Sequence, residues 1–388
     1  MRNIAMIAYT TLSTDSRVIR EALAAKEADF NVDLYTLNER NRINLDRMNI
    51  IYTENMQYKG KNKFKFVLGY ISFFFFCFFK ISKNYLNKRY KIIHVNNMPN
   101  FFVFCCIIPK LLGAKIILDI HDLIPEVYAQ KFNISLHHLF IKFLYLEERI
   151  SGNVADAVIS TNRLHSKRFI SNKIRKNDFP IILNAADEKI FKSLNNRNFL
   201  AKEIIIIYPT TIAKHLGIDI LIDAMVILKR RNVKVKLKIF GDGEYRETAI
   251  KLIDRKRLND YIKFSDGFVS LSYLAHEYNK AHIGIFPASK GYSNNIAMPN
   301  KIHEYFIKNL CVVASNTEII KEYFSNNVIL FEAGDHEDLA DKLYMLIQDR
   351  GLMKRYAQKG HEYYIKHPWS KYKKRYINLL NELANTKV

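Results

Sequence analysis

The chain of 388 residues carries 60 Lys and Arg against 38 Asp and Glu, which gives a formal net charge of +22 at pH 7. Apolar residues make up 49% of the chain, enough for a sizeable core, so the composition excludes a disordered, collagen-like or disulfide-scaffold protein. The length predicts two domains of ordinary size.

Short apolar segments alternate with longer amphipathic segments through the first half of the chain. The segments predicted as strands are 3–8, 32–36, 92–95, 115–119 and 157–161, and those predicted as helices are 16–28, 100–112 and 136–151. A polar stretch at 192–197 is the natural linker, so we expect a first domain over residues 1–192.

The second half repeats this alternation. Its predicted strands are 203–208, 234–240, 262–265, 283–287, 311–314 and 328–331, and its predicted helices are 218–230, 245–256, 273–281, 301–308 and 336–348. The pattern predicts an α/β protein of two doubly wound domains, the second over residues 198–366, with parallel sheets covered on both faces. Such a tandem places a ligand cleft between the carboxyl ends of the strands. Pro368 interrupts the last helical pattern, so 369–383 is expected to be a separate helix.

The excess positive charge is concentrated in one part of the chain. Residues 55–118 contain eleven Lys and Arg and no Asp or Glu, which is half of the net charge. Inside this window the apolar run 66–79, FVLGYISFFFFCFF, has 14 residues, fewer than the roughly 20 that a membrane-spanning helix needs. The run predicts either a contact of residues 59–91 with an anionic membrane surface or a buried helix whose flanking lysines are solvated.

Several other features narrow the class of protein. The four cysteines lie in apolar runs without metal-ligand spacing, which indicates core residues in a reducing compartment. The first residues lack the pattern of a signal peptide, so we expect a cytoplasmic chain. No zinc-finger spacing or RNP-type motif accompanies the positive charge, and we expect no nucleic-acid partner.

The scarce glycines argue against the common nucleotide-binding motifs. The sequence contains neither G-x-G-x-x-G after a strand nor G-x-x-x-x-G-K-[ST], which disfavours an NAD enzyme or a kinase. The single G-x-G, Gly241-Asp242-Gly243, follows a predicted strand and by itself indicates a tight turn.

Six more specific segments occur in order along the chain. The first half contributes Asp15-x-Arg17-Val18-x-Arg20-Glu21-Ala22, the stretch from His94 to Glu126 with Asp119-Ile120-His121-Asp122, and the segment 155–162. The second half contributes Gly241-Asp242-Gly243, the segment 264–269, and Pro299-Asn300-Lys301-Ile302-His303-Glu304-Tyr305. With these segments the chain resembles the family-4 retaining glycosyltransferases of bacterial polysaccharide biosynthesis. The resemblance implies the GT-B fold, two Rossmann-like domains facing each other across a cleft, with a C-terminal helix, 367–388, that crosses back to the first domain.

The resemblance implies three catalytic residues. His121 follows a predicted strand, and the matching histidine lies against the donor sugar, whereas the structural alternative is a core or capping histidine. Glu304 matches the carboxylate that accepts hydrogen bonds from the ribose hydroxyls of a sugar nucleotide, although a glutamate in a first turn can also simply complement the helix dipole. Lys301 shares the helical face of Glu304 and either neutralises a diphosphate or is solvated.

The resemblance also assigns the two sides of the cleft. Donor binding is expected at Thr210, Thr211, Lys214, His215, Gly241, Gly243, Gly267, Phe268, Val269, Pro299 and Asn300, where the threonines and nearby N–H groups would hold phosphate at a helix N-terminus. The acceptor side is expected at Asp15, Arg17, Asn97, Asp122 and Glu126.

Two positions depart from the family pattern. The family commonly carries Glu-x7-Glu, but Ile296 stands eight residues before Glu304. The loop after the first strand of the second domain usually carries a glycine and an Arg/Lys pair, whereas here it reads YPTTIAKHLG, with Lys214 and His215 as the nearest basic residues. These departures motivate an alternative function, a catalytically weak glycosyltransferase-like binding or scaffold subunit of a glycan assembly complex.

The leading hypothesis is a hexosyl-type, retaining glycosyltransferase. It would move a sugar from a UDP- or GDP-linked donor to a lipid-linked or oligosaccharide acceptor, with the departing diphosphate stabilised by Lys301, Lys214 or His215 and by backbone dipoles. We expect no essential metal and no cofactor besides the donor substrate, because no Asp-x-Asp with a supporting ligand set stands out. The expected location is the cytoplasm, peripheral at the inner face of the cell membrane.

Overall fold

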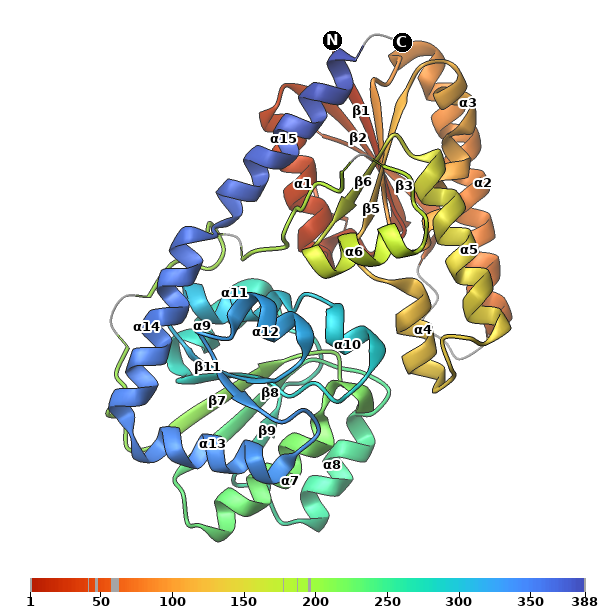
Figure 1. The fold of residues 1–388 in the computed structure, drawn as a ribbon. Coiled ribbons are helices and arrows are strands. Elements are labelled where there is room, and N and C mark those ends of the chain that lie inside the picture. The colour runs from red at the N-terminus through yellow and green to blue at the C-terminus, as the bar shows by residue number, and fades with distance from the viewer. Residues whose placement is uncertain are drawn as a thin grey trace. The chain divides into compact units, whose positions relative to one another are not determined.

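The computed structural model of the protein describes residues 2–40, 42–45, 48–56, 63–176, 178–186, 188–194 and 197–386. The chain forms two compact units, an N-terminal unit of Met1–Asn184 with Ser370–Val388 and a C-terminal unit of Ala185–Trp369. Each unit contains a six-stranded sheet flanked by helices (Figure 1). The predicted α/β class with two doubly wound domains is confirmed.

The N-terminal sheet has the strand order β3-β2-β1-β4-β5-β6, and neighbouring strands are parallel. The elements before the C-terminal unit are β1 (Arg2–Ala8), η1 (Leu12–Thr14), α1 (Ser16–Glu27), β2 (Phe30–Asn38), β3 (Asn49–Met56), α2 (Lys63–Lys88), β4 (Ile92–Asn96), η2 (Asn100–Cys106), α3 (Ile107–Leu111), β5 (Lys115–Ile120), α4 (Ile124–Phe132), α5 (Leu139–Val154), β6 (Ala157–Ser160) and α6 (Arg163–Ser171).

The C-terminal sheet has the order β12-β11-β10-β7-β8-β9 and is also parallel. Its unit contains β7 (Ile204–Pro209), η3 (Lys214–Leu216), α7 (Ile218–Arg230), β8 (Val235–Phe240), α8 (Arg246–Arg255), β9 (Ile262–Phe264), α9 (Leu271–Lys280), β10 (Ile283–Phe286), α10 (Tyr292–Ile296), α11 (Asn300–Ile307), β11 (Cys311–Ser315), α12 (Glu318–Phe324), β12 (Ile329–Phe331), α13 (His336–Gln348) and α14 (Arg350–Lys366), and the last helix of the chain is α15 (Trp369–Asn385).

Each sheet reverses its strand order at one point, between β1 and β4 in the N-terminal unit and between β7 and β10 in the C-terminal unit. In open parallel sheets, ligands bind outside the carboxyl ends of the strands at such a switch point. The loops that begin at Tyr9 and Asn97 lie at this point in the first sheet, and those that begin at Thr210 and Pro287 lie at it in the second. These loops are where a site is expected in each unit.

The sequence did not predict the strand β3 or the short helices α4, α6, α10 and α12. β3 is an edge strand that pairs with β2 and carries the polar residues Asn49, Thr53 and Glu54. The expected helix 100–112 is divided into the 3-10 helix η2 and the short α3. All the predicted strands are found, with ends that differ by one or two residues.

The division between the units falls at Asn184, before the predicted linker at 192–197. Phe191 packs against Tyr278 with ring centroids 5.9 Å apart. The guanidinium of Arg197 donates hydrogen bonds to the carbonyl oxygens of Tyr278, Lys308 and Asn309 at 3.0, 2.6 and 3.1 Å. These contacts hold the described part of the expected linker within the C-terminal unit, while residues 195–196 lie outside the described residues.

The segment expected to return to the first domain is α15, which from Ser370 onward belongs to the N-terminal unit. The hydroxyl of Tyr376 lies 2.7 Å from Nδ1 of His94 on β4. Lys373 forms an ion pair of 2.6 Å with Glu27 of α1, beside which α15 lies in Figure 1. The helix is therefore joined to the N-terminal unit by buried and by exposed polar contacts.

Helix α2 is longer than the apolar run that predicted it. It has 26 residues, and its stretch Val67–Lys88, with a mean hydropathy of 1.2, is long and apolar enough to cross a membrane by length and composition alone, a test that core helices of soluble proteins also pass. The length argument against a membrane span is therefore wrong. Residues Phe73, Cys77, Ile81 and Tyr85 nevertheless form a buried face at every fourth position, and the helix contacts β1 and β3. α2 thus covers part of one face of the N-terminal sheet.

Candidate active site

The start of α11 lies against the switch point of the C-terminal sheet. The ammonium of Lys301 lies 4.6 Å from the ring centroid of Tyr208 on β7 and 5.8 Å from that of Phe286 on β10. Burial lowers the pKa of Lys301 to about 8, although the charge of Glu304 opposes this shift. An anionic ligand would raise this pKa again and keep the ammonium charged, so the position suits a phosphate oxygen.

The carboxylate of Glu304 is held by a buried tyrosine. Tyr278 of α9 donates its hydroxyl to Oε2 of Glu304 at 2.6 Å. Burial raises the pKa of Tyr278 well above its usual value, and the charge of Glu304 adds to the shift, so the hydroxyl remains a donor at any working pH. Glu304 is thereby oriented before a ligand binds. It lies beyond the first turn of α11, so the alternative of a first-turn glutamate that complements the helix dipole is wrong.

The Gly241-Asp242-Gly243 turn packs directly on the loop after β7. A Cβ on Gly241, which has a φ of +143°, would lie 1.9 Å from the carbonyl oxygen of Thr210, and one on Gly243 would lie 2.4 Å from that of Ile212. The backbone N–H of Ile212 donates to the carbonyl oxygen of Asp242 at 2.9 Å. These glycines therefore fix the course of the loop that carries Thr210 and Thr211.

Lys214 and His215 lie exposed in η3, between this loop and α7. Ser289 and Asn294, from the region after β10, donate to the carbonyl oxygen of His215 at 2.7 and 3.2 Å. Gly217, with a φ of +82°, is the N-cap of α7 and has no side chain that could cap the helix. The first turn of α7 therefore offers free backbone N–H groups beside two basic side chains.

The remaining expected donor-binding residues follow the same edge. Gly267 pairs with Gly241 in an isolated bridge, which brings the exposed Phe268 and the half-buried Val269 close to the glycine turn. Pro299 is buried directly before α11, and Asn300 is its exposed first residue. Ile296 ends α10.

In the N-terminal unit His121 follows β5 and stands beside a buried ion pair. Its Nδ1 lies 3.5 Å from Oδ2 of Asp119. Burial lowers the pKa of His121, but Asp119 outweighs burial and the net shift is upward. Arg17 donates to Oδ2 and Oδ1 of Asp119 at 2.8 Å each. Arg17, which was expected on the acceptor side, is therefore buried and hydrogen-bonded within the unit.

Two carboxyl groups compete for the single charge of Arg17. Nε of Arg17 also lies 3.3 Å from Oε1 of Glu21. Burial raises the pKa of Glu21 to about 8 against the pull of Arg17, whereas Arg17 overcomes burial at Asp119 and holds the pKa of that carboxyl well below its usual range. Burial also lowers the pKa of His94, 3.8 Å from Glu21, to about 4. Near neutral pH the cluster is an Arg17–Asp119 pair with Glu21 and His94 uncharged.

Glu21, His94 and Asp119 offer ligand atoms within 4.8 Å of one another, the spacing of a metal site. Both oxygens of Asp119 are bonded by Arg17, however, and Nδ1 of His94 faces Tyr376. Groups of the protein itself therefore neutralise the negative charge of this cluster and occupy its hydrogen-bonding directions. We assign it the role of holding Asp119, and through it His121.

Asn97 clamps the backbone that carries His121. Its side chain donates to the carbonyl oxygen of Asp122 at 2.6 Å and accepts from the backbone N–H groups of His121 and Asp122 at 3.3 Å each. Asp122 is exposed, and Asp15 caps α1 by accepting from the backbone N–H of Val18. Of these expected acceptor-side residues, Asp122 is the one with a fully exposed position.

Glu126 belongs to a separate buried network. Arg168 donates to both of its oxygens at 2.5 and 3.1 Å, and the hydroxyl of Tyr145 donates to Oε1 at 3.0 Å. The same guanidinium also pairs with Glu148. The carboxylate of Glu126 is thus bound within the N-terminal unit, where it ties α4 to α5 and α6.

Replacing Glu21 by Gln should remove a pH dependence of stability. A folded pKa raised to about 8 means that Glu21 stabilises the fold fully below its unfolded pKa and that this contribution is lost as pH rises through about 8. We expect urea unfolding of the natural protein to show a loss on the order of 3–4 kcal/mol between pH 5 and pH 8 that Glu21→Gln abolishes. Equal pH slopes for the two proteins would contradict a protonated Glu21.

Comparison with known proteins agrees with this geometry. Residues 189–363 match the family model described as glycosyl transferases group 1. Sucrose-phosphate synthase from Thermosynechococcus elongatus has the same fold, with 16% identity, 99% of each chain covered and a TM-score of 0.79. So do Anabaena HepE in complex with UDP and glucose (14% identity, 98% of this chain and 100% of that one, TM-score 0.75) and a variant of S. aureus TarM in complex with Fondaparinux, alpha-GlcNAc-glycerol and UDP (14%, 98% and 100%, TM-score 0.73).

At these identities the likeness to solved structures shows the fold, and the family match covers the C-terminal unit. That match includes the loop after β7, the glycine turn and the Lys301–Glu304 helix. The chain therefore has the two-domain α/β fold of GT-B glycosyltransferases, and its residues 189–363 match the group 1 glycosyltransferase family.

Proposed function

We propose that the protein transfers a hexosyl group from a nucleotide diphosphate donor to a glycan acceptor, with retention of the anomeric configuration. The observation that carries this proposal is that Lys301 and Glu304 lie together on α11 at the switch point of the C-terminal sheet, within the residues that match the group 1 family. One side chain is a partly desolvated cation and the other an oriented carboxylate, which suit a diphosphate and a ribose.

Charge grows on the diphosphate as the glycosidic bond loosens towards an oxocarbenium-like state. Lys301, Lys214 or His215, and the backbone N–H groups at the start of α7, are positioned in this unit to stabilise that charge. In a retaining transfer the acceptor attacks from the face that the leaving group vacates, so no protein nucleophile is needed. His121, whose pKa is raised beside Asp119, can donate a hydrogen bond to a sugar hydroxyl.

The donor is proposed to be a UDP-linked sugar in preference to a GDP-linked sugar. HepE and TarM, which share the fold, were both solved with UDP. The acceptor is proposed to be a lipid-linked glycan before a free oligosaccharide, because the N-terminal unit exposes a large apolar surface on α2. A binding or scaffold subunit is the second candidate, favoured by Ile296 in place of the first glutamate of the family pattern.

A nucleotide panel separates these candidates. With UDP, GDP and ADP sugars in turn, we expect UDP-linked donors to give the largest rise in melting temperature, to a degree set by their affinity and concentration. We also expect release of UDP in the presence of a lipid-linked acceptor, unchanged by EDTA. Stabilisation without turnover would support the scaffold, and no stabilisation by any nucleotide would overturn the proposed function.

A further inference from the structure

Helix α2 presents an apolar stripe to solvent opposite its buried face. The stripe consists of Phe64, Leu68, Ile71, Phe75, Phe79 and Leu86. Phe79 and Leu86 are 65% and 62% exposed, whereas Phe73 and Cys77 on the other side are buried. A helix of a soluble protein normally turns polar residues outward, so this stripe lacks an explanation within the fold.

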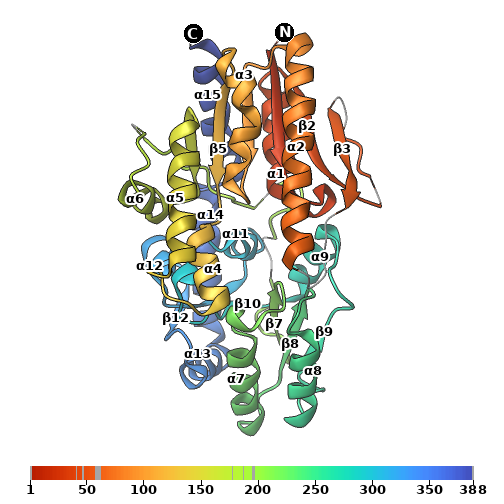
Figure 2. The ribbon, with the colours of Figure 1, turned by 90° about the vertical axis from the view of Figure 1, so that its right-hand side faces the viewer.

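A second stripe runs along α5. Leu139, Phe143, Leu146 and Ile150 are spaced by four, three and four residues and are all exposed, with Leu139 at 80% and Phe143 at 61%. α3 lies between the two helices, and its Leu111 is 80% exposed. Figure 2 shows α2, α3 and α5 side by side on one face of the N-terminal sheet. We call the surface made by these three helices and η2 the apolar face.

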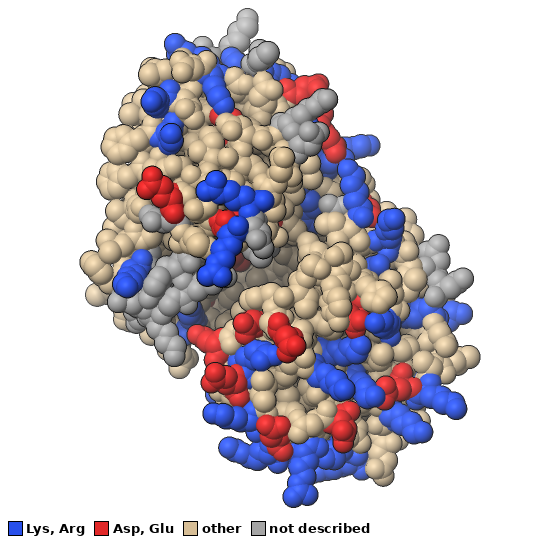
Figure 3. Space-filling view, turned by 180° about the vertical axis from the view of Figure 1, so that it is seen from behind, with Lys and Arg blue, Asp and Glu red and all other residues tan. Residues whose placement is uncertain are grey.

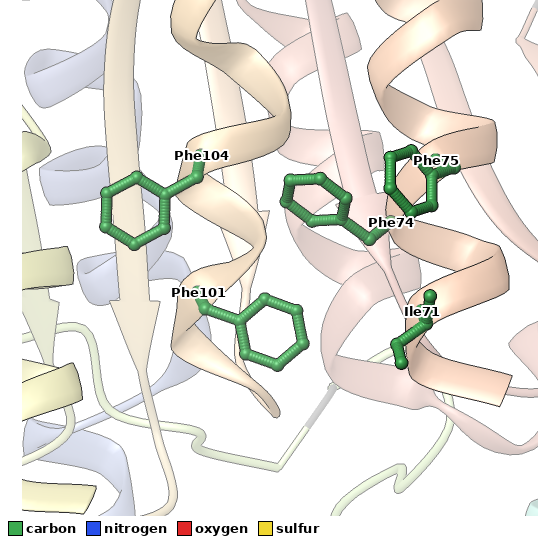
Figure 4. A pocket seen from close by; sticks show the side chains of 5 residues that line it. All are labelled: Ile71, Phe74, Phe75, Phe101 and Phe104. Carbon is green, nitrogen blue, oxygen red and sulfur yellow. The ribbon is translucent and has the colours of Figure 1, made fainter. Parts of the chain in front are cut away.

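A shallow groove between α2 and η2 adds to this face. It has a volume of about 290 Å³ and is lined by Ile71, Phe74, Phe75, Phe101 and Phe104, whose side chains are shown in Figure 4. The rings of Phe74 and Phe101 approach across it to 6.0 Å between centroids. The apolar face therefore has both projecting side chains and an apolar recess between them.

The charges around the apolar face are mostly positive, and the acidic Asp156 beside α3 is paired with Lys110. Lys80 and Lys83 are exposed on α2, and residues 55–118, which include α2, η2 and α3, contain no Asp or Glu. The two acidic residues of α5 turn inward: Glu148 is buried against Arg168, and Glu147 accepts hydrogen bonds from Asn100 and Ser151. On the face drawn in Figure 3, Lys, Arg, Asp and Glu are interspersed over the C-terminal unit in the lower part of the picture.

We propose that the apolar face docks on an anionic lipid bilayer, with α2 and α5 both at the interface. Apolar side chains flanked by lysines complement a surface of negative headgroups over hydrocarbon. A second copy of the chain would instead bring lysines against lysines, which is repulsive. The buried face of α2 packs on the sheet, so the helix lies along the bilayer and does not cross it. The apolar face extends beyond the predicted membrane contact at residues 59–91, of which 59–62 lie outside the described residues. Docking through this face would hold the protein peripherally at a membrane.

Vesicle sedimentation with the full chain tests this proposal. We expect binding to vesicles of phosphatidylcholine with 30% phosphatidylglycerol and at least tenfold weaker binding to phosphatidylcholine alone or in 0.5 M salt. The variants Phe75→Ser/Phe79→Ser on α2 and Leu139→Ser/Phe143→Ser on α5 should each lower binding at least tenfold. Phe73 is buried and is left unchanged, because its replacement would unfold the helix.

Leu200→Ser is the matched control, since Leu200 is 82% exposed but lies in the C-terminal unit. It should bind vesicles like the natural protein, and circular dichroism should show all variants folded. Full binding by the α5 variant, equal binding to neutral vesicles, or dimerisation through this face without vesicle binding would overturn the proposal. UDP binding measured without vesicles reports on the proposed function separately, so either can fail alone.

Discussion

Glu304→Ala should lower kcat/KM for sugar transfer by about 10³-fold while the protein stays folded. A carboxylate that accepts two ribose hydroxyls contributes two charge-assisted hydrogen bonds, each worth roughly 1.5–3 kcal/mol, and alanine removes both. Glu304 is half-buried and its Oε2 is already bound by Tyr278, so the carboxylate needs no ordering when the donor arrives. Steady-state kinetics and calorimetric titration with UDP give the two readouts.

Two further variants decide what the carboxylate does. Tyr278→Phe keeps the ring and removes the hydroxyl that donates at 2.6 Å, so Glu304 loses its orientation and kcat/KM should fall about tenfold. Glu318→Ala is the control, because Glu318 is an exposed glutamate in the first turn of the neighbouring helix α12 and should leave kinetics unchanged. Unchanged UDP affinity in Glu304→Ala would contradict the ribose assignment.

The sequence predicted the elements whose character is decided locally. The central strands are buried on both faces, so β7 appears as the run Ile204–Pro209 and β1 contains five consecutive buried residues. β3 was not predicted, because it is an edge strand whose polar residues interrupt the apolar pattern. The unit boundary falls at Asn184, before the predicted linker at 192–197: Arg197 is polar in sequence, yet its guanidinium donates to carbonyl oxygens at the ends of α9 and α11.

The site divides in the same way. His121, Lys301 and Glu304 were predicted from motifs; His121 follows β5 and Lys301 lies in the first turn of α11, with Glu304 one turn further along that helix. The sequence did not indicate a role for Tyr278, because its partner Glu304 lies 26 residues further along the chain, on another helix. Arg17 was matched to the acceptor side, but its partner Asp119 lies 102 residues away, and this distant partner determines its buried position. Contacts between residues that are far apart in the chain are the part of the site that a single sequence does not predict.

Arg17→Met should destabilise the N-terminal unit by about 3–5 kcal/mol, the cost of leaving a buried charge without its partner. Asp119 is fully buried, and Arg17 supplies both of its 2.8 Å hydrogen bonds within the cluster. Without the guanidinium, burial raises the pKa of Asp119, so the variant gains stability as pH falls and its carboxyl becomes protonated. The loss relative to the natural protein should therefore be larger at pH 8 than at pH 5. Hydrogen exchange of the β5 amides measures it within the intact chain.

Asp119→Asn should be milder in stability and more severe for His121. Glu21 already lies 3.3 Å from Nε of Arg17, and once Asp119 is neutral the pKa of Glu21 falls and its carboxylate replaces the lost partner. The pKa of His121, which Asp119 raises, should drop, and NMR titration of the imidazole together with the pH profile of kcat would both follow it. A purely structural role for Asp119 predicts instead a stability loss as large as that of Arg17→Met and a His121 pKa that does not move. The contrast between the two variants therefore tests whether this buried cluster exists to set the charge of His121.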